Sequence, residues 1–363
     1  MARQTDEAAQ AWLEGLFASV PMPALSAAVA GPDGPLWQSA LGEVDLEHDV
    51  LAAPHHRFRL ASVSKPITAT LAARLASKGL VDLAAPIAWW LPDLPAHHRA
   101  TTLAQLLNHQ GGVRHYLPRD HDQAQPFGSI HTRSTWNREQ VLAVFIDDPL
   151  VAPPGTQTHY SSFGYSLASM VLEVAAGAPF MDLVADEIAG PLGLPSLAAD
   201  NRARLIKHRA RSYSSAQERA MLQQAFPQAN WPDPVEGWAP ALPVNPGYSV
   251  AGGGMLASMP DIARFGAAHL PGPQSPVSDE ERRVLFTPST VADGTHAVTG
   301  LGWRVNHDAS GRLRWHHCGG MVGARTSLVV YPELDLAVAL ATNTMGTLGD
   351  VLGPASALAD CFA

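Results

Sequence analysis

Two kinds of side chain are scarce in this sequence. Its 363 residues include only two cysteines, Cys318 and Cys361, and three lysines, Lys65, Lys78 and Lys207. Two cysteines do not make a disulfide framework, so nothing indicates an oxidising compartment. The formal net charge is −9, which argues against a nucleic-acid partner because surfaces that bind phosphates are normally basic.

Long apolar runs are also missing. No stretch is long and apolar enough to span a membrane. Residues 1–7 lack a basic segment followed by an apolar run, which is the pattern of a secretory signal. We therefore expect a cytoplasmic protein, or a periplasmic or secreted one if a leader precedes this sequence. With 46% hydrophobic and 16% charged residues, the chain can bury a sizeable core.

Two hydrolase patterns are absent from the sequence. No Gly-x-Ser-x-Gly occurs, which disfavours an α/β-hydrolase, and no His-Glu-x-x-His occurs, which disfavours a zinc hydrolase. Adjacent histidines rarely face one metal ion, so we interpret three such pairs as surface residues: His55–His56, His97–His98 and His316–His317. We expect neither a metal nor another cofactor.

One short motif points to a nucleophile. Ser62 and Lys65 form the only Ser-x-x-Lys of the sequence. Residues i and i+3 share one face of a helix, so the Lys65 ammonium can reach the Ser62 hydroxyl. Pro66 fits the first turn of a helix, which places Ser62 at a helix N-terminus, where free N–H groups favour negative charge. An ordinary surface serine and lysine would show the same spacing.

The order of the expected elements predicts the fold class. Apolar periodicity and turn residues predict strands at 24–30, 35–41, 301–305, 313–317, 326–331 and 336–342, and main helices at 7–20, 62–77, 163–176, 181–188 and 348–361. A further helix is expected to begin at Ser258, with Ser258 as its cap. We predict an α+β fold whose antiparallel sheet is built from both ends of the chain and covered by the terminal helices. A helical domain, 81–240, would be inserted into the sheet domain, 1–80 and 241–363.

Tyr160 is a candidate base for the serine. It follows a Pro-Gly turn and precedes the helix expected at 163–176, so its phenol can project from a loop. A phenol has an unperturbed pKa of about 10, but a nearby ammonium favours the phenolate, and burial favours the neutral lysine amine. Tyr160 and Lys65 can therefore share a proton and accept the one that Ser62 loses. A half-buried structural tyrosine fits the same context.

A third segment, 315–320, follows an expected strand. Gly319 and Gly320 let a substrate approach the strand edge, where backbone N–H groups can bind an oxyanion. His317 is a candidate donor to a substrate carbonyl or carboxylate. We interpret His316 as solvent-facing, because neighbours in a strand point to opposite faces. Cys318 is interpreted as a small buried filler, because no base is evident beside it.

The segment 226–246 is rich in proline and contains Trp231 and Trp238. It fits a long surface connection with two packed tryptophans. It fits a lid or pocket wall equally well, because long loops with aromatic residues often shape binding sites.

Seven segments occur together in an order that is typical of one family: Phe58–Pro66, Leu103–Gly112, Pro154–Ser162, Pro191–Leu194, Gly252–Ser258, Gly300–Trp303 and His317–Gly320. From about residue 24 to 343 the chain resembles the serine β-lactamase-related hydrolases, which include class C β-lactamases, DD-peptidases, D-aminopeptidases and family VIII esterases. The resemblance implies a β-lactamase/transpeptidase-like fold. It also implies that Ser62 is acylated, that Lys65 and Tyr160 are its base system, and that the N–H groups of Ser62 and Gly320 form the oxyanion hole.

Two positions depart from the family pattern. Where Tyr-x-Asn is common, the third residue here is Ser162, which offers one hydroxyl in place of an amide. Where β-lactamases commonly have Lys-Thr-Gly, this chain has His317, Cys318 and Gly319, so a fixed positive charge becomes a titratable imidazole. Both changes weaken the case for β-lactam hydrolysis and favour a neutral substrate, since esterases of this group tolerate histidine there.

The sequence therefore predicts a serine acyl hydrolase that acts on small or medium carboxylic esters through an acyl-enzyme. Two alternatives stay open. One is a D-amino-acid peptidase or amidase, or a weak penicillin-binding β-lactamase, with a small amide as substrate. The other is a non-catalytic scaffold of the same fold, which the joint presence of Ser62, Lys65 and Tyr160 disfavours.

Overall fold

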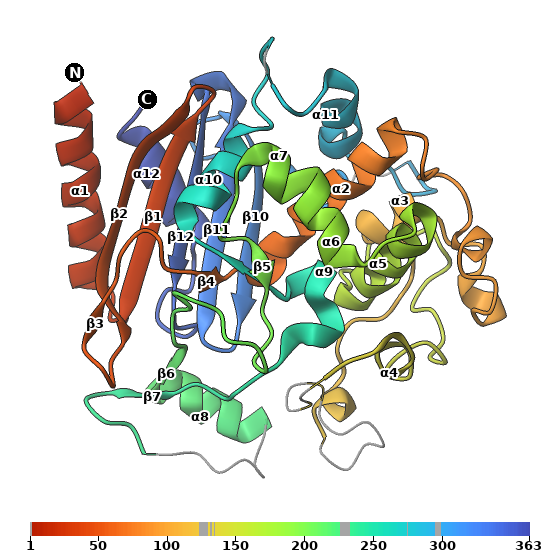
Figure 1. The fold of residues 1–363 in the computed structure, drawn as a ribbon, viewed down its shortest axis with the longest axis horizontal. Coiled ribbons are helices and arrows are strands. Elements are labelled where there is room, and N and C mark those ends of the chain that lie inside the picture. Colours follow the sequence, from red (N-terminus) through yellow and green to blue (C-terminus); the bar gives the residue numbers. More distant parts are fainter. Residues whose placement is uncertain are drawn as a thin grey trace.

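An antiparallel sheet forms the centre of the computed structural model, which describes residues 2–122, 130, 133, 135–225, 233–273, 275–294 and 299–363. The sheet has seven strands in the order β3-β2-β1-β12-β11-β10-β9 (Figure 1). From one edge to the other these are β3 (Val50–Leu51), β2 (Gly34–Asp45), β1 (Ala24–Gly31), β12 (Leu336–Thr342), β11 (Ala324–Tyr331), β10 (Leu313–Met321) and β9 (Arg304–His307).

The two ends of the chain meet in the middle of this sheet. β1 pairs with β12, with Leu25 opposite Thr342 and Ala30 opposite Ala337. Every residue of β1 and of β12 is buried, as expected for strands that are covered on both faces. The predicted sheet, built from both ends of the chain, is confirmed.

Helices cover both faces of the sheet. On one face lie α1 (Ala2–Ser19), which packs on β2, and α12 (Leu352–Asp360), which packs on β11 and β12 (Figure 1). On the other face, α10 (Met259–Ala267) contacts β1, β2, β11 and β12. The predicted terminal helices are therefore confirmed as cover for the sheet.

The remaining elements lie mostly between β3 and β9 in sequence. The helices are α2 (Ser64–Ser77), α3 (Leu103–Leu107), α4 (Arg138–Leu142), α5 (Ser162–Ala176), α6 (Phe180–Val184), α7 (Gly190–Leu192), α8 (Ala216–Ala225), α9 (Val250–Gly253) and α11 (Asp279–Phe286). Two small sheets join β4 (Phe58–Arg59), β8 (Met255–Ala257) and β5 (Ala198–Ala199), and β6 (Tyr213–Ser215) with β7 (Trp238–Pro240). Strands β5, β6 and β7 were not expected in a stretch that reads as helical. The division of the chain into domains at residues 80 and 241 stays a prediction.

Local signals set several helix ends. Ser161 caps α5 by accepting a hydrogen bond from the Gly164 N–H, and Gly177, with φ 70°, ends it. The predicted helix start with Ser258 at the cap position is confirmed, but the capping hydrogen bond is not formed. Ser258 stands at the cap position of α10 without a capping bond; its hydroxyl pairs with that of Ser196 at 3.0 Å instead, because a buried tertiary partner competes for it.

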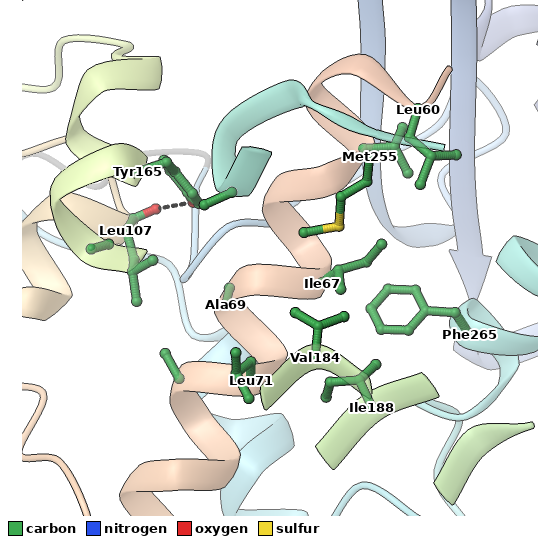
Figure 2. Packing of buried hydrophobic residues seen from close by; sticks show 14 of the residues in the cluster. Leu60, Ile67, Ala69, Leu71, Leu107, Tyr165, Val184, Ile188, Met255 and Phe265 are labelled. Atoms are coloured by element: carbon green, nitrogen blue, oxygen red, sulfur yellow. Dashed lines mark hydrogen bonds between the residues drawn. The ribbon is translucent and has the colours of Figure 1, made fainter. Parts of the chain in front are cut away.

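Helix α2 runs through the middle of the hydrophobic core. Every residue from Ser64 to Leu75 is buried. Figure 2 shows Ile67 and Leu71 of this helix among side chains from other elements, including Val184, Ile188, Met255 and Phe265. The core therefore fixes the position of the helix that starts beside Ser62.

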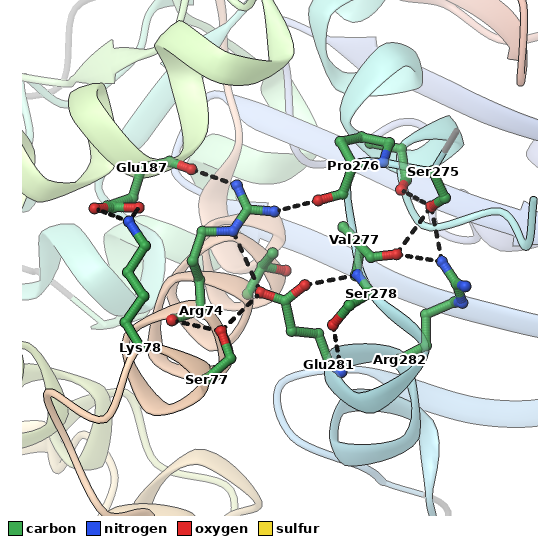
Figure 3. Close-up of polar contacts among 12 residues, drawn as sticks. Arg74, Ser77, Lys78, Glu187, Ser275, Pro276, Val277, Ser278, Glu281 and Arg282 are labelled. Carbon is green, nitrogen blue, oxygen red and sulfur yellow. Dashed lines mark hydrogen bonds and ion pairs between the residues drawn. The ribbon is translucent and has the colours of Figure 1, made fainter. Parts of the chain in front are cut away.

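A polar network anchors the far end of α2. The Arg74 guanidinium donates to the carbonyls of Glu187, at 2.6 Å, and Pro276, at 2.7 Å, and lies 3.3 Å from the Glu281 carboxylate (Figure 3). Arg74 and Glu281 are both buried, and a buried charge needs such partners to offset its lost hydration. The network ties α2 to the start of α11.

We compared the length and apolar character of the helices with those of a membrane-spanning helix. In the described part of the chain no single helix has the length and apolar character to cross a membrane. Among the described helices, one bent pair meets that test by length and composition: α5 and the helical run Phe180–Leu192, which are joined across an 80° bend.

Candidate active site

Ser62 lies in a single 3₁₀ turn, Ala61–Val63, directly before α2. Pro66 falls in the first turn of α2, as the sequence predicts. Ala61 has φ 45°, in the left-handed region that non-glycine residues rarely adopt. Such strain is kept where the surrounding structure over-determines it, often at functional sites.

Two side chains predicted to act on Ser62 lie within hydrogen-bond distance of its Oγ. The Tyr160 phenol donates to Ser62 Oγ at 2.6 Å, and the Lys65 ammonium donates to the same oxygen at 3.2 Å. Lys65 Nζ also lies 4.6 Å from the centre of the Tyr160 ring. Tyr160 is 98 residues from Ser62 in sequence, so the fold alone brings it to the serine.

The surroundings of Lys65 and Tyr160 separate their roles. Lys65 is fully buried, and burial lowers its pKa to about 7, with a smaller contribution from the nearby charge of Arg304. Burial raises the pKa of Tyr160 to about 12. Near neutral pH the free amine of Lys65 is therefore the available base, while Tyr160 keeps its proton.

Two further contacts hold the Lys65 head group in place. Nζ donates to the Gly252 carbonyl at 2.5 Å and to Ser162 Oγ at 3.2 Å. Ser162, predicted as a substrate-binding residue, thus contacts the base directly. Gly252 comes from α9, which packs on both α2 and α5. The segment Gly252–Ser258 carries part of the family resemblance, but this carbonyl contact could not be foreseen from it.

Two histidines that sequence reasoning missed flank Tyr160. The His109 ring lies 4.4 Å and the His115 ring 5.3 Å from the Tyr160 ring, centre to centre. Each accepts a backbone hydrogen bond at Nδ1, His109 from Ser161 at 3.2 Å and His115 from Ser162 at 3.3 Å. Burial lowers the pKa of His115 to about 4 and that of His109 well below its usual value. Both rings are therefore neutral and position the tyrosine loop.

The edge of β10 approaches the serine because Gly319 has no side chain. A Cβ at this position would lie 2.3 Å from the Leu60 carbonyl oxygen and 3.0 Å from the Ser62 nitrogen. Gly320, the next residue, lines the same cavity as Ser62. The structure thus brings the two backbone segments predicted to form the oxyanion hole to one cavity.

His317 differs from its expected state. Its ring is buried, and Nδ1 lies 2.8 Å from the Cys318 carbonyl oxygen, which can only accept, so Nδ1 carries the proton. Burial lowers the pKa of His317 well below its usual value, so Nε2 is an unprotonated acceptor. In this state Nε2 offers a lone pair, and the substrate-binding role of His317 stays a prediction.

The interpretation of the paired histidines as surface residues is wrong for one member of each of the first two pairs and for both members of the third pair. His56, His98, His316 and His317 are buried. His316 lies opposite Val329, which belongs to the core beneath the terminal helices, so the face expected to meet solvent is covered. Burial raises the pKa of the Cys318 thiol to about 11, which fits a filler and not a nucleophile.

A cavity of about 330 Å³ opens beside Ser62. Ser62, Tyr160 and Gly320 line it together with mainly apolar residues: Tyr116, Val244, Pro246, Tyr248, Met321, Val322 and Met345. Val244 and Pro246 come from the proline-rich segment 226–246, so this end of the segment is a pocket wall. Trp231 and the rest of 226–232 lie outside the described residues.

A second cavity, of about 200 Å³, is also lined by Tyr160. His317 and Arg304 line it as well. Arg304 is exposed and pairs through its backbone with His316 in the sheet, while its guanidinium makes no hydrogen bond or ion pair with the described residues. Its charge lowers the pKa values of Lys65, Tyr160 and His317. No pattern in the sequence singled out Arg304, because a charged residue in a short edge strand is ordinary.

The chain is similar to known proteins along most of its length. A family model described as "Beta-lactamase" matches residues 9–360. The chain is 24% identical to "Serine beta-lactamase-like protein LACTB, mitochondrial" of Homo sapiens, over 82% of this chain and 66% of that protein, so it spans slightly less than two thirds of that relative. It is 26% identical to "Esterase EstB" of Burkholderia gladioli, over 85% and 83%. A D-stereospecific amidohydrolase from Streptomyces sp. has a similar structure, with a TM-score of 0.75, 25% identity and coverage of 97% and 98%.

Proposed function

Since the chain belongs to the Beta-lactamase family, whose members are serine hydrolases with a β-lactamase/transpeptidase-like fold, we propose that it is an esterase for small or medium carboxylic esters. The observation that carries this proposal is the position of Ser62 in a cavity with mainly apolar walls, where its Oγ is hydrogen-bonded to Tyr160 and Lys65. Such walls suit an uncharged acyl group. Resemblance to an esterase over most of both chains supports the same choice.

Acylation begins with a proton transfer from Ser62. The free Lys65 amine accepts this proton, directly or through the Tyr160 hydroxyl, and the Ser62 oxygen attacks the ester carbonyl carbon. Negative charge collects on the former carbonyl oxygen, where the N–H groups of Ser62 and Gly320 would stabilise it. As the carbon–oxygen bond to the leaving group breaks, the proton held by Lys65 passes to the departing alkoxide, directly or through the Tyr160 hydroxyl, which is protonated at neutral pH. The alcohol leaves, and Lys65 is again a free amine.

Deacylation repeats these steps with water. The Lys65 amine takes a proton from the water, hydroxide adds to the acyl carbon, and the Ser62 oxygen leaves with a proton from the same base system. The products are a carboxylic acid and free enzyme. His317 is neutral and offers only a lone pair, so it cannot supply the fixed positive charge that a substrate carboxylate would meet in a Lys-Thr-Gly motif.

The experiment compares substrate classes on one protein. Wild type and Ser62→Ala are assayed with p-nitrophenyl esters of increasing acyl length and with a chromogenic cephalosporin. We expect ester turnover in wild type, its loss in Ser62→Ala, and little cephalosporin turnover. Equal ester rates for the two proteins would reject Ser62 as the nucleophile. Fast cephalosporin turnover without ester turnover would reject the esterase.

One observation favours a second candidate, a peptidase or amidase for D-amino-acid substrates that carry a carboxylate. Arg304 presents an exposed cation in the cavity next to Tyr160, and a guanidinium binds carboxylates well. Similarity to a D-stereospecific amidohydrolase supports this candidate. If it is right, Arg304→Ala raises KM for a D-peptide with a free carboxylate and leaves KM for a neutral ester unchanged. Equal effects on both substrates would count against it.

A further inference from the structure

Three histidines gather on the surface, away from the residues that line the two cavities. His55, His56 and His208 each offer a ring nitrogen, and these nitrogens all lie within 4.8 Å of one another. The His55 ring stacks on His56 at 4.5 Å and meets His208 edge-on at 4.6 Å, centre to centre. His56 is buried, whereas His55 and His208 are exposed. Among the described residues this is the one group of three or more such side chains with ligating atoms this close.

The backbone builds this cluster from two distant segments. The Arg57 N–H donates to the His208 carbonyl at 2.8 Å, and the Ala210 N–H donates to the Arg57 carbonyl at 3.0 Å. His208 has φ 60°, a left-handed conformation that turns the chain beside His56. The juxtaposition therefore does not depend on the flexible side chains alone.

The backbone of Ala53 holds the ring of the buried histidine in place. The Ala53 N–H donates to His56 Nδ1 at 3.0 Å, and the same Nδ1 lies 3.2 Å from the Ala53 carbonyl oxygen. Binding of a metal ion at Nε2 selects the other tautomer, in which Nδ1 carries the proton and donates to the carbonyl in place of accepting from the N–H. A hydrogen bond of this kind fixes the tautomer and orientation of a metal ligand.

We propose that His55, His56 and His208 bind a divalent transition-metal ion, with Zn²⁺ as the best match. Zinc takes imidazole nitrogens at about 2.0–2.1 Å in tetrahedral geometry. The exposed rings of His55 and His208 can rotate, so that their nitrogens reach an ion bound to the buried ring of His56. Three protein ligands leave a fourth position, which water can fill at this exposed site.

Neighbouring cations oppose an ion at this place. Arg57 follows His56 in the chain, and its buried Nε makes no hydrogen bond to the described residues. Arg209 follows His208 in the chain, but its guanidinium donates to the Asn201 carbonyl at 2.7 Å and lies 3.5 Å from the Asp200 carboxylate. Lys207 is exposed, where solvent screens its charge. The site is separate from Ser62, so this inference does not rest on the proposed esterase activity.

The test uses untagged, metal-free full-length protein, so that a purification tag supplies no histidines. Binding of Zn²⁺ is measured by titration calorimetry, and coordination is read from the visible absorption spectrum of the Co²⁺ form. The variants are His55→Ala and His208→Asn, since asparagine tolerates the left-handed backbone. His97→Ala is the control, because the His97 ring lies 4.3 Å from that of His98, centre to centre, and no third ligating side chain of the described residues joins this pair.

We expect one Zn²⁺ site in wild type and in the His97→Ala control, with a tetrahedral Co²⁺ spectrum. Loss of a ligand should raise Kd at least about 100-fold, the upper range seen when only an outer-shell partner is removed. Far-ultraviolet circular dichroism checks that each variant is folded. If His208→Asn does not fold, the Zn²⁺ affinity of His55→Ala alone tests the proposal. Wild type that binds no Zn²⁺ at millimolar concentration, or variants that bind as tightly as wild type, would overturn the proposal.

Discussion

Burial of Lys65 predicts a stability that rises with pH. The pKa of Lys65 falls from 10.5 in the unfolded chain to about 7 in the folded protein, mainly because its ammonium is desolvated. The unfolded state therefore binds more protons between these values, and the free energy of unfolding increases as pH rises through that window. A tenfold change in an acid dissociation constant corresponds to about 1.4 kcal/mol, so burial of the protonated form costs about 4–5 kcal/mol.

The assay is urea unfolding followed by tryptophan fluorescence at pH 7, 8 and 9. From pH 7 to 9 we expect Lys65 to add about 2 kcal/mol to the free energy of unfolding. Other groups titrate in this range, so Lys65→Met is the reference, because its free energy of unfolding lacks the contribution of Lys65 titration. Lys78→Met is the matched control, because Lys78 is exposed and pairs with Glu187; its pH profile should follow that of wild type. Parallel profiles for wild type and Lys65→Met would refute the reasoning.

Three further predictions follow from the same structure. Because the free amine of Lys65 is the base, kcat/KM should fall on the acid side with an apparent pKa of about 7; a pH–rate profile that is flat from pH 5 to 9 would contradict this. Gly319→Ala should abolish most ester turnover, since its Cβ overlaps backbone, whereas Gly272→Ala, with open space around it, should leave the rate unchanged. Glu281→Ala should lower the free energy of unfolding by about 3–5 kcal/mol, because it leaves the buried Arg74 cation without its carboxylate. Glu280→Ala, a change at an exposed residue, should lower it by at most about 0.5 kcal/mol. Equal losses for the two variants in urea titrations would argue against the network of Figure 3.

The parts of the site that depend on local spacing were predictable from the sequence. Ser62 and Lys65 meet because i and i+3 share a helix face, and the structure gives their distance as 3.2 Å. The long strands of the main sheet were predictable for a similar reason, because apolar segments bounded by turn residues mark them locally. Tyr160 is different: only its place in a family-like order of segments indicated that it would reach Ser62.

The burial and protonation of site residues could not be predicted from the sequence, because they depend on which elements cover each face of the sheet. Strand periodicity places His316 and His317 on opposite faces, but it does not say that both faces are covered. The protonation of His317 follows from its burial and from the Cys318 carbonyl, neither of which a motif encodes. His115 and Arg304 likewise reach the site from loops and an edge strand without a local signal.

The most direct test of the central claim is the intact mass of the protein after a short incubation with a slowly hydrolysed acylating inhibitor. We predict that wild type gains the mass of one acyl group and that peptide mapping places it on Ser62. Lys65→Met and Tyr160→Phe should acylate much more slowly, because the Ser62 oxygen loses the base or the phenol that contacts it. An acyl group found on another residue, or the same adduct in Ser62→Ala, would contradict the account.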